Sequence, residues 1–307
     1  MKPAWMVWVA LASACQGKVE GGGGRGGVGR EFDGARAFGY LEQQMRFGPR
    51  IPNTTGHDRA ADWLLALLRA RADTVIVQEI RHRTRHGDTL RLRNHFARFR
   101  PGAAERVLFL AHWDTRPHAD QSANLGAQRL PVPGANDGAS GVAVLLGVAD
   151  ALKARPPAVG VDLLFVDGED YGDFADSSEV LIGSRYFAAH QPAGYPPLYA
   201  VLFDMVGGKD LRIYYEGNSM AFAPEVVERV WRKANELGYG RTFVPQVCPR
   251  CTLIDDHVAL QHAGIHAIDV VVNLDHYPYW HTTEDTLDKV SAASLQIVGD
   301  VAVALVR

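Results

Sequence analysis

Short apolar runs alternate with longer segments of helical periodicity along most of this chain. The continuous apolar runs are typical of strands buried on both faces of a sheet, and they cover residues 106–111, 160–167, 198–204 and 267–274. A β-branched run at 74–80 indicates one more strand. Apolar residues at helical spacing cover residues 56–72, 138–154, 225–238, 256–264 and 292–306. Because strands alternate with helices, the pattern predicts an α/β fold, a three-layer α/β/α sandwich with a mostly parallel, mixed central sheet.

Acids and histidines follow the buried strands or begin the helices after them. In sheets of this kind, ligands bind beyond the carboxyl ends of the strands, which meet at one edge. The residues at these positions are His112, Asp137, Glu169, Asp170, Asp204, Asp255, Asp256 and His281. We therefore expect these side chains to gather at one edge of the sheet.

Each of these residues also has an ordinary structural explanation. Asp137 could cap the helix that follows it, Asp204 could pair with an arginine, and His281 alone could be a buried structural residue. Together, however, four or five carboxylates at one edge repel one another and cannot all ionise without a cation. Histidine combined with carboxylates suits zinc. The sequence therefore predicts a metal site.

Other catalytic motifs are absent from the sequence. It contains no His-Glu-x-x-His helix, no phosphate-binding loop and no Gly-x-Ser-x-Gly elbow. Ser140 lies among small residues that fit close helix packing better than a nucleophile. Cys248 and Cys251, in "CPRC", look like a redox pair or half a zinc knuckle, but no second pair accompanies them. A small disulfide loop beside the site is the interpretation we prefer, although the sequence leaves the bond itself open.

The N-terminal segment differs from the rest of the chain. Residues 1–15 contain a lysine, an apolar run and small residues before Cys15, which is the layout of an export signal. We expect a lipoprotein-type signal that leaves Cys15 lipidated; an ordinary signal peptide is the alternative. Residues 16–30 read as a Gly-rich linker, and residues 31–307 as a single catalytic domain. The expected location is the bacterial periplasm, either free or tethered to the membrane.

Composition narrows the classes of partner. The chain is 47% hydrophobic and 22% charged, which is ordinary for a globular protein. Its net charge of −3 argues against a nucleic-acid surface, which needs a concentrated basic face. No apolar run is long enough to span a bilayer, so we expect membrane contact only through the lipid anchor. We expect a monomer.

Seven motifs in the predicted domain resemble those of the zinc exopeptidase superfamily. Within it they are most similar to the glutaminyl cyclases (glutaminyl-peptide cyclotransferases), in the bacterial group that resembles the animal enzymes. The similarity covers nearly all of residues 31–307. The motifs are "HWD" at 112, "GANDGASG" at 134, "FVDGEDYG" at 165, "GSRYF" at 183, "LFDMVGG" at 202, "IDDH" at 254 and "WHTTEDT" at 280.

The resemblance implies one of two metal sites. The cyclases hold one zinc ion per chain, on the residues that match Asp137, Asp170 and His281, and leave the equivalent of His112 unliganded. The di-zinc aminopeptidases of the superfamily bind a second ion, for which His112 is the candidate ligand.

Three features favour the cyclase over the aminopeptidase. Asp255 precedes the "DH" that aminopeptidases also carry, and Trp280 precedes the late histidine, where aminopeptidases typically have a smaller aliphatic residue. The acidic pair is Glu-Asp rather than Glu-Glu, as in the bacterial cyclases.

The resemblance also implies the reaction and the role of each residue. The substrate would be a peptide or protein with N-terminal glutamine, which is converted to pyroglutamate with release of ammonia. Glu169 would be the general base and acid, oriented by Asp204 and Asp255. The expected walls of the substrate pocket are Trp280, Tyr277 and Leu253. The alternatives are a di-zinc aminopeptidase and a zinc-binding protein that has lost catalysis.

Overall fold

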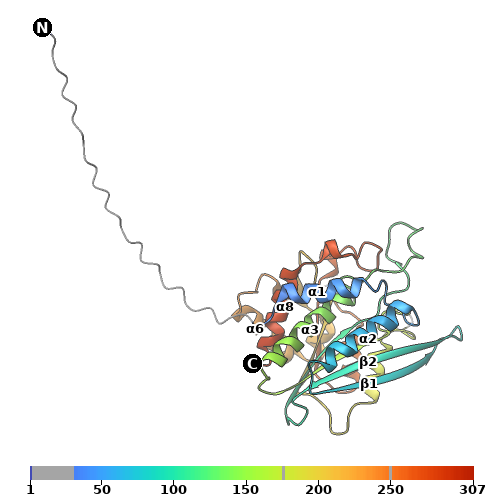
Figure 1. Cartoon of the computed structure of the whole chain (residues 1–307), viewed down its shortest axis with the longest axis horizontal. Coiled ribbons are helices and arrows are strands. Elements are labelled where there is room, and N and C mark those ends of the chain that lie inside the picture. Colours follow the sequence, from blue (N-terminus) through green and yellow to red (C-terminus); the bar gives the residue numbers. More distant parts are fainter. Residues whose placement is uncertain (2–30, 175–176, 249–250) are drawn as a thin grey trace. The chain divides into compact units, whose positions relative to one another are not determined.

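The computed structural model describes residue 1 and residues 31–174, 177–248 and 251–307 (Figure 1). Glu31–Arg307 forms one compact unit. The predicted export signal, Cys15 and the Gly-rich linker lie outside the described residues and stay predictions. Among the helices of the described residues, none is both long and apolar enough to cross a membrane.

A six-stranded mixed sheet forms the centre of this unit. Its strands are β1 (Thr74–Arg83), β2 (Thr89–Phe99), β3 (Arg106–His112), β4 (Gly160–Val166), β5 (Tyr199–Asp204) and β8 (Ala267–Val271). Their spatial order is β1-β2-β4-β3-β5-β8. Strand β2 runs antiparallel to both β1 and β4, whereas β4, β3, β5 and β8 are mutually parallel. The two short strands β6 (Ile213–Tyr215) and β7 (Phe243–Val247) form a separate parallel pair.

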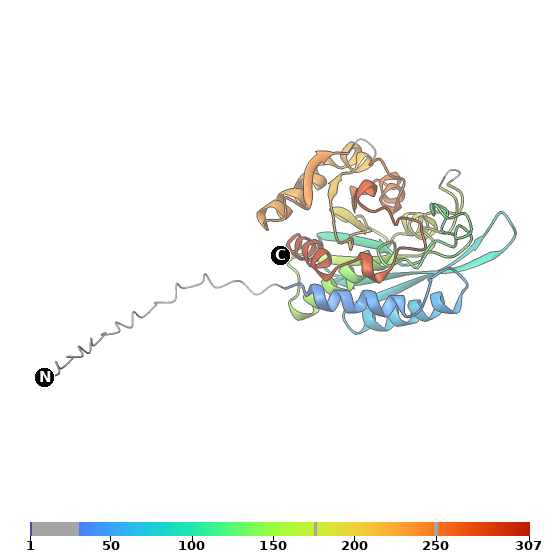
Figure 2. The same ribbon diagram turned by 90° about the horizontal axis from the view of Figure 1, so that it is seen from above.

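Helices cover both faces of the central sheet (Figures 1 and 2). One face carries α1 (Gly34–Met45), α2 (Thr55–Arg69), α3 (Ala139–Ala154) and α8 (Ala292–Ala304). The other face carries α4 (Ile182–Ala189) and α7 (Asp256–His262). The remaining helices, which lie near β8, are α5 (Gly217–Phe222) and α6 (Pro224–Glu236). Figure 1 shows α1, α3 and α8 packed side by side.

Alternate side chains of β3 enter the two hydrophobic cores. Val107 and Phe109 pack in the core with α1, α3 and α8, whereas Leu108 packs with Phe187 of α4 and Leu260 of α7. Every residue of β3 is therefore buried, which explains why its sequence is continuously apolar rather than alternating. The predicted three-layer α/β/α sandwich is confirmed.

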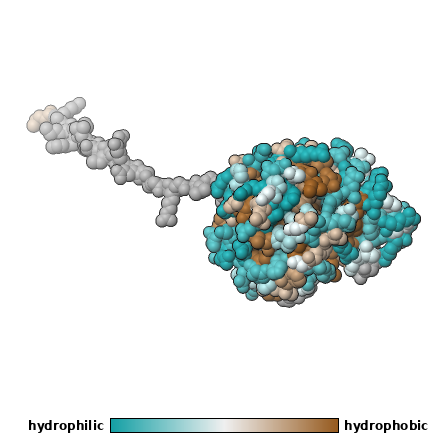
Figure 3. Space-filling view, turned by 90° about the horizontal axis from the view of Figure 1, so that it is seen from below, coloured by the Kyte–Doolittle hydropathy of each residue, from teal (hydrophilic) through white to brown (hydrophobic). Residues whose placement is uncertain are grey.

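Some elements differ from the sequence pattern. Strand β2 was not expected, because only one of its faces is buried along its first half: Leu90 and Leu92 are covered, while Arg91 is exposed. The hairpin of β1 and β2, at the right of Figure 3, presents a hydrophilic surface. The run at 267–274 ends early as a strand because Asn273 caps a 3₁₀ turn at Leu274–His276.

Candidate active site

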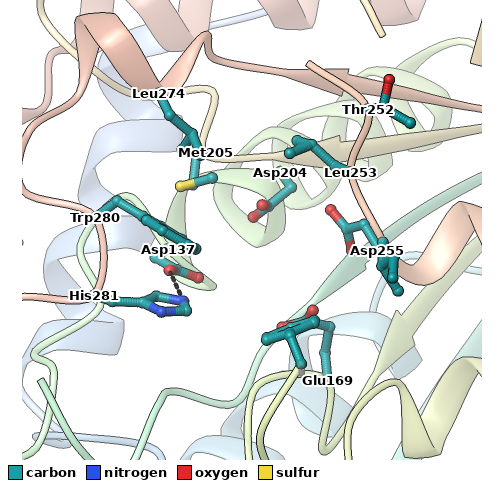
Figure 4. Close-up of a pocket in the computed structure, with 12 residues that line it drawn as sticks. Asp137, Glu169, Asp204, Met205, Thr252, Leu253, Asp255, Leu274, Trp280 and His281 are labelled. Atoms are coloured by element: carbon teal, nitrogen blue, oxygen red, sulfur yellow. Dashed lines mark ion pairs between the residues drawn. The ribbon is translucent and has the colours of Figure 1, made fainter. Parts of the chain in front are cut away.

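The structure brings the predicted acids and histidines together at the carboxyl end of the parallel strands. His112 ends β3, Asp204 ends β5, and Glu169 and Asp170 follow β4. These side chains are buried, with at most 7% of each residue exposed. Figure 4 shows Glu169, Asp204 and Asp255 pointing from three different elements into one cavity.

Three of these residues form a cluster that could hold a metal ion. Asp137, Asp170 and His281 each offer one ligand atom, and these atoms lie within 4.8 Å of one another. The Nε2 atom of His281 is 3.3 Å from Oδ1 of Asp170 and 3.6 Å from Oδ2 of Asp137. The Oδ2 atom of Asp170 is buried and accepts no hydrogen bond from any described residue. Two carboxylates, one with an unpartnered oxygen, and an imidazole fit zinc.

A second cluster shares Asp137 with the first. The Nε2 atom of His112 lies 3.1 Å from Oδ1 of Asp204 and 3.2 Å from Oδ1 of Asp137, and these three residues could also surround an ion. The geometry is therefore compatible with one metal ion or with two.

Two further buried aspartates hold the backbone of the site. Asp114 accepts hydrogen bonds from the main-chain N–H groups of Glu169 and Asp170, both at 3.1 Å. Asp285 accepts from the N–H groups of Asn136 (2.8 Å) and Asp137 (3.0 Å). Because a buried carboxylate needs such donors, these contacts fix both acidic loops. Both aspartates lie in motifs noted in the sequence, "HWD" and "WHTTEDT", but neither was assigned a role there.

His281 has an unusual backbone conformation. Its φ is 52°, in the left-handed region that non-glycine residues rarely adopt. Such strain persists only where the surroundings enforce it, and it is common at functional sites. The ring of Trp280 stacks on the imidazole of His281 with centroids 4.0 Å apart, and the N–H of Gln121 donates to the carbonyl of His281 at 3.2 Å.

Burial and neighbouring carboxylates raise the pKa values of Asp255 and Glu169. Burial raises the pKa of Asp255 to about 7, and the nearby charge of Asp204 adds to this shift. Burial also raises the pKa of Glu169 well above its ordinary value; His112 opposes the shift, whereas Asp170 and Asp255 increase it. These carboxylates therefore need either protons or a cation to balance their charge.

A cavity of about 250 Å³ opens beside the first cluster. Its polar residues are Asp137, Glu169, Asp204, Thr252, Asp255 and His281, and its apolar walls are Phe174, Met205, Leu253, Ile254, Leu274 and Trp280. A cavity of this size, apolar at the sides and acidic at one end, suits a small polar side chain or one residue of a peptide.

The structure places two of the three predicted wall residues at the cavity. Trp280 and Leu253 line the cavity, but Tyr277 does not. Its hydroxyl group donates to Oδ1 of Asp285 at 2.6 Å, because a buried phenol needs a partner, and its ring borders a separate cavity of about 230 Å³.

Several pocket residues were missed in the sequence. Met205 directly follows Asp204, and Ile254 directly precedes Asp255, so adjacency to a predicted acid was the signal that could have identified them. Phe174 lies in a loop four residues beyond Asp170, where no local pattern indicates which way its side chain points.

Two smaller expectations are settled by the structure. Ser140 is structural, because its hydroxyl donates to the carbonyl of Asn136 at 2.6 Å and accepts from the N–H of Val206 at 3.0 Å. Cys248 and Cys251 form a disulfide. The residues directly after Cys251, Thr252 to Asp255, line the cavity.

Comparisons with solved structures show relatives over most of the chain. A glutaminyl cyclase of Bacteroides thetaiotaomicron, bound to N-acetylhistamine, is 35% identical and superimposes with a TM-score of 0.85, over 90% of this chain and 97% of that chain. A leucine aminopeptidase precursor from the same species gives the same values. The similarity to bacterial glutaminyl cyclases inferred from the motifs is thereby confirmed.

Comparison with curated proteins gives a more distant match. The aminopeptidase YwaD of Bacillus subtilis is 27% identical over 210 residues, which represent 65% of this chain and 40% of that protein. The chain thus spans less than half the length of this relative. The family model described as Peptidase family M28 matches residues 94–306, well over half of the chain. This chain belongs to peptidase family M28.

Proposed function

We propose that the protein is a zinc-dependent glutaminyl-peptide cyclotransferase, which converts N-terminal glutamine of peptides or proteins to pyroglutamate and releases ammonia. The observation that carries this proposal is the small cavity of about 250 Å³, in which Trp280 and Leu253 form walls and Glu169, Asp204 and Asp255 meet beside the metal cluster. The similarity to bacterial glutaminyl cyclases over nearly their whole length supports it.

The reaction takes place within one residue of the substrate. The α-nitrogen forms a bond to the δ-carbon of the glutamine side chain, and the bond from that carbon to the amide nitrogen breaks. The α-nitrogen loses a proton, and the leaving nitrogen gains one to depart as ammonia. Because both reacting groups belong to one residue, the enzyme's main task is to hold them in the folded arrangement and to move the proton.

Asp137, Asp170 and His281 would hold the zinc ion. When bound, zinc supplies a Lewis acid that polarises the amide oxygen of the substrate. Glu169 lies at the acidic end of the cavity and belongs to neither metal cluster, so its carboxyl group is free to transfer a proton. We assign it the transfer from the α-nitrogen to the leaving nitrogen.

Asp204 and Asp255 would support Glu169. Their carboxyl groups face the same cavity (Figure 4), and each raises the pKa of its neighbours, so they titrate as a coupled group. A proton shared within this group would orient Glu169 and leave an acceptor directed at the substrate amine.

Trp280 and Leu253 would restrict the substrate side chain. The indole ring stacks on the imidazole of His281 with an angle of 29° between the ring planes and forms a wall of the cavity. Restricting the rotamers of glutamine brings the amine and the carbonyl group together and lowers the entropic cost of cyclisation.

A di-zinc aminopeptidase is the second candidate, because His112, Asp137 and Asp204 form a second cluster that could hold an ion. An inactive zinc-binding protein is the third. The full-length protein, loaded with zinc, should be assayed on Gln-peptides and on Leu- and Ala-peptides, with metal analysis alongside. Ammonia and pyroglutamate with one zinc per chain are expected. Free amino acids with two zinc ions would establish the aminopeptidase, and inactivity on all peptides would support the third candidate.

The cellular setting belongs to the same proposal. The disulfide Cys248–Cys251 suits an oxidising compartment, which supports export to the periplasm, with Cys15 as the lipid-bearing residue. The substrates would be exported peptides or proteins with N-terminal glutamine, and the enzyme would act as a monomer.

A further inference from the structure

We propose that Arg116 and Asp120 are positioning residues for the metal site, which hold Asp170 and His281 in a ligand-ready arrangement before an ion binds. The inference rests on the metal site of the proposed function, but not on the reaction. Arg116 and Asp120 lie in the loop after β3, and neither belongs to a metal cluster.

Arg116 connects two carboxylates. Its Nη1 atom donates to Oδ1 of Asp170 at 2.8 Å, and its Nε and Nη2 atoms donate to the two oxygens of Asp120, each at 2.8 Å. The guanidinium group has the planar fork that such two-oxygen contacts require. Only 8% of the Arg116 side chain and 1% of the Asp170 side chain are exposed, so their contact is shielded from water, whereas 40% of the Asp120 side chain is exposed.

The contact with Arg116 restricts how the Asp170 carboxylate can turn. Arg116 occupies Oδ1, while Oδ2 is the buried oxygen without a hydrogen-bond donor among the described residues. A carboxylate held in this way has little freedom to rotate. Arg116 therefore fixes the orientation of the Asp170 carboxylate, whose Oδ1 atom also lies 3.3 Å from Nε2 of His281.

Asp120 acts on the other ligand. Its Oδ1 atom lies 3.4 Å from Nδ1 of His281, whereas Nε2 of His281 faces Asp137 and Asp170. A carboxylate beside Nδ1 favours the tautomer with its hydrogen on Nδ1, which leaves the lone pair on Nε2 for a metal ion.

The main chain strengthens the same connection. The N–H of Gln121, next to Asp120, donates to the carbonyl of His281 at 3.2 Å, and the N–H of Val132 donates to the carbonyl of Arg116 at 3.1 Å. Arg116, Asp120, His281 and Asp170 thus form a closed ring of contacts in which two members are metal ligands. Partners of this kind typically change metal affinity by about 10–100-fold when removed.

The test measures zinc affinity directly, by competition between the full-length protein and a chelator of known zinc affinity. We expect Asp120→Ala to weaken zinc binding about 10–100-fold, and Asp120→Asn to weaken it less, because its amide oxygen still accepts a hydrogen bond. Arg116→Lys should also weaken binding, since an ammonium group cannot bridge both carboxylates as a fork.

Asp150→Ala is the matched control. Asp150, on α3, also accepts a hydrogen bond from an arginine, Arg71 at 2.7 Å, but it does not line the active-site cavity. Its removal should leave zinc affinity unchanged. Thermal unfolding of each metal-free variant shows whether the fold is retained, and Asp120→Asn, with the same shape as aspartate, serves if Asp120→Ala does not fold.

Unchanged zinc affinity in Asp120→Ala and Arg116→Lys, or in Asp120→Asn where Asp120→Ala does not fold, or no zinc binding by the wild-type protein, would overturn the inference. Failure of the proposed function looks different. In that case the wild-type protein binds zinc, and the variants bind it more weakly, but Gln-peptides yield no pyroglutamate.

Discussion

Buried acids of this site divide into two groups by what their oxygens contact. Asp114 and Asp285 accept hydrogen bonds from main-chain N–H groups and so fix the loops that carry Asp137 and Asp170. Glu169, by contrast, faces the cavity. At the scale of single residues, the first kind of acid determines geometry and the second kind is available for proton transfer.

Replacing Glu169 with glutamine tests that division. Glutamine keeps the shape of the side chain but cannot accept and return a proton, so we expect kcat on Gln-peptides to fall by about 10²–10⁴. Zinc content should stay the same, because Glu169 belongs to neither metal cluster. Ammonia release and metal analysis measure the two effects, with exposed Glu225→Gln as the control. Nearly full activity in Glu169→Gln would exclude it as the proton carrier.

At the scale of elements, hydrogen bonds from the N-terminal end of α5, at Glu216 and Asn218, hold Leu253 in the cavity wall. Residues 251–254 have no regular secondary structure, yet Leu253 is held from both sides. Its N–H donates to the carboxylate of Glu216 at 2.9 Å, and its carbonyl accepts from Nδ2 of Asn218 at 2.7 Å. The N–H of Gly217 donates to the carbonyl of Cys251 at 2.6 Å.

Glu216→Gln should loosen this wall. Burial opposes ionisation of Glu216, but the imidazole of His257, 3.2 Å away, and hydrogen bonds from Ser219 and Leu253 lower its pKa to about 2, so the carboxylate that holds Leu253 is charged. A hydrogen bond to a charged group contributes about 1.5–3 kcal/mol, and one to a neutral group about 0.5–1.5 kcal/mol. Losing the difference of about 1.4 kcal/mol from substrate binding would raise KM roughly tenfold, with a smaller change in kcat.

A double-mutant cycle with Leu253→Ala tests whether Glu216 affects KM by holding Leu253 or by stabilising the protein in general. If Glu216 acts through Leu253, then adding Glu216→Gln to Leu253→Ala should raise KM little further. Independent, multiplying effects of the two substitutions on KM would contradict this role of Glu216. Urea unfolding of each variant measures the accompanying loss of stability.

The sequence pattern predicted elements well where burial is complete and poorly where it is partial. The strands β3, β4, β5 and β8 appear as continuous apolar runs because both of their faces are covered. Helix α5 is only six residues long, and its position depends on capping by Glu216 rather than on an apolar stripe, so periodicity does not reveal it.

At the scale of the whole molecule, the sequence predicts the acidic end of the site better than the walls of its cavity. The acids could be predicted to converge because parallel strands place their carboxyl ends at one edge. The walls depend on side-chain directions in irregular loops. Tyr277 turns away to reach Asp285, and Phe174 enters the cavity from the loop that follows Asp170, where its ring lies beside Arg116 and His281. Contacts with neighbouring loops, which no local sequence pattern encodes, decide such directions.

The gathering of acids from distant segments makes the stability of the metal-free protein depend on pH. Asp255 has a pKa of about 7 in the folded protein, against about 3.9 in an unfolded chain. Below about pH 4 both states carry the protonated group, but between about pH 4 and 7 only the folded state keeps the proton. Unfolding then releases a proton, so the free energy of unfolding falls as pH rises, by up to about 4 kcal/mol for this group.

Urea unfolding of the chelator-treated protein at about pH 4.5, 6 and 7.5 should therefore show decreasing stability. Asp255→Asn should reduce the slope, because the amide does not titrate, while Asp204 and Glu169, whose pKa values are also raised by burial, keep part of it. Zinc should flatten the dependence, because the cation supplies the positive charge that the ionised carboxylates lack. The prediction is wrong if the free energy of unfolding of the metal-free protein stays level or rises between about pH 5 and 7. The pKa of Asp255 would then not be raised in the folded protein.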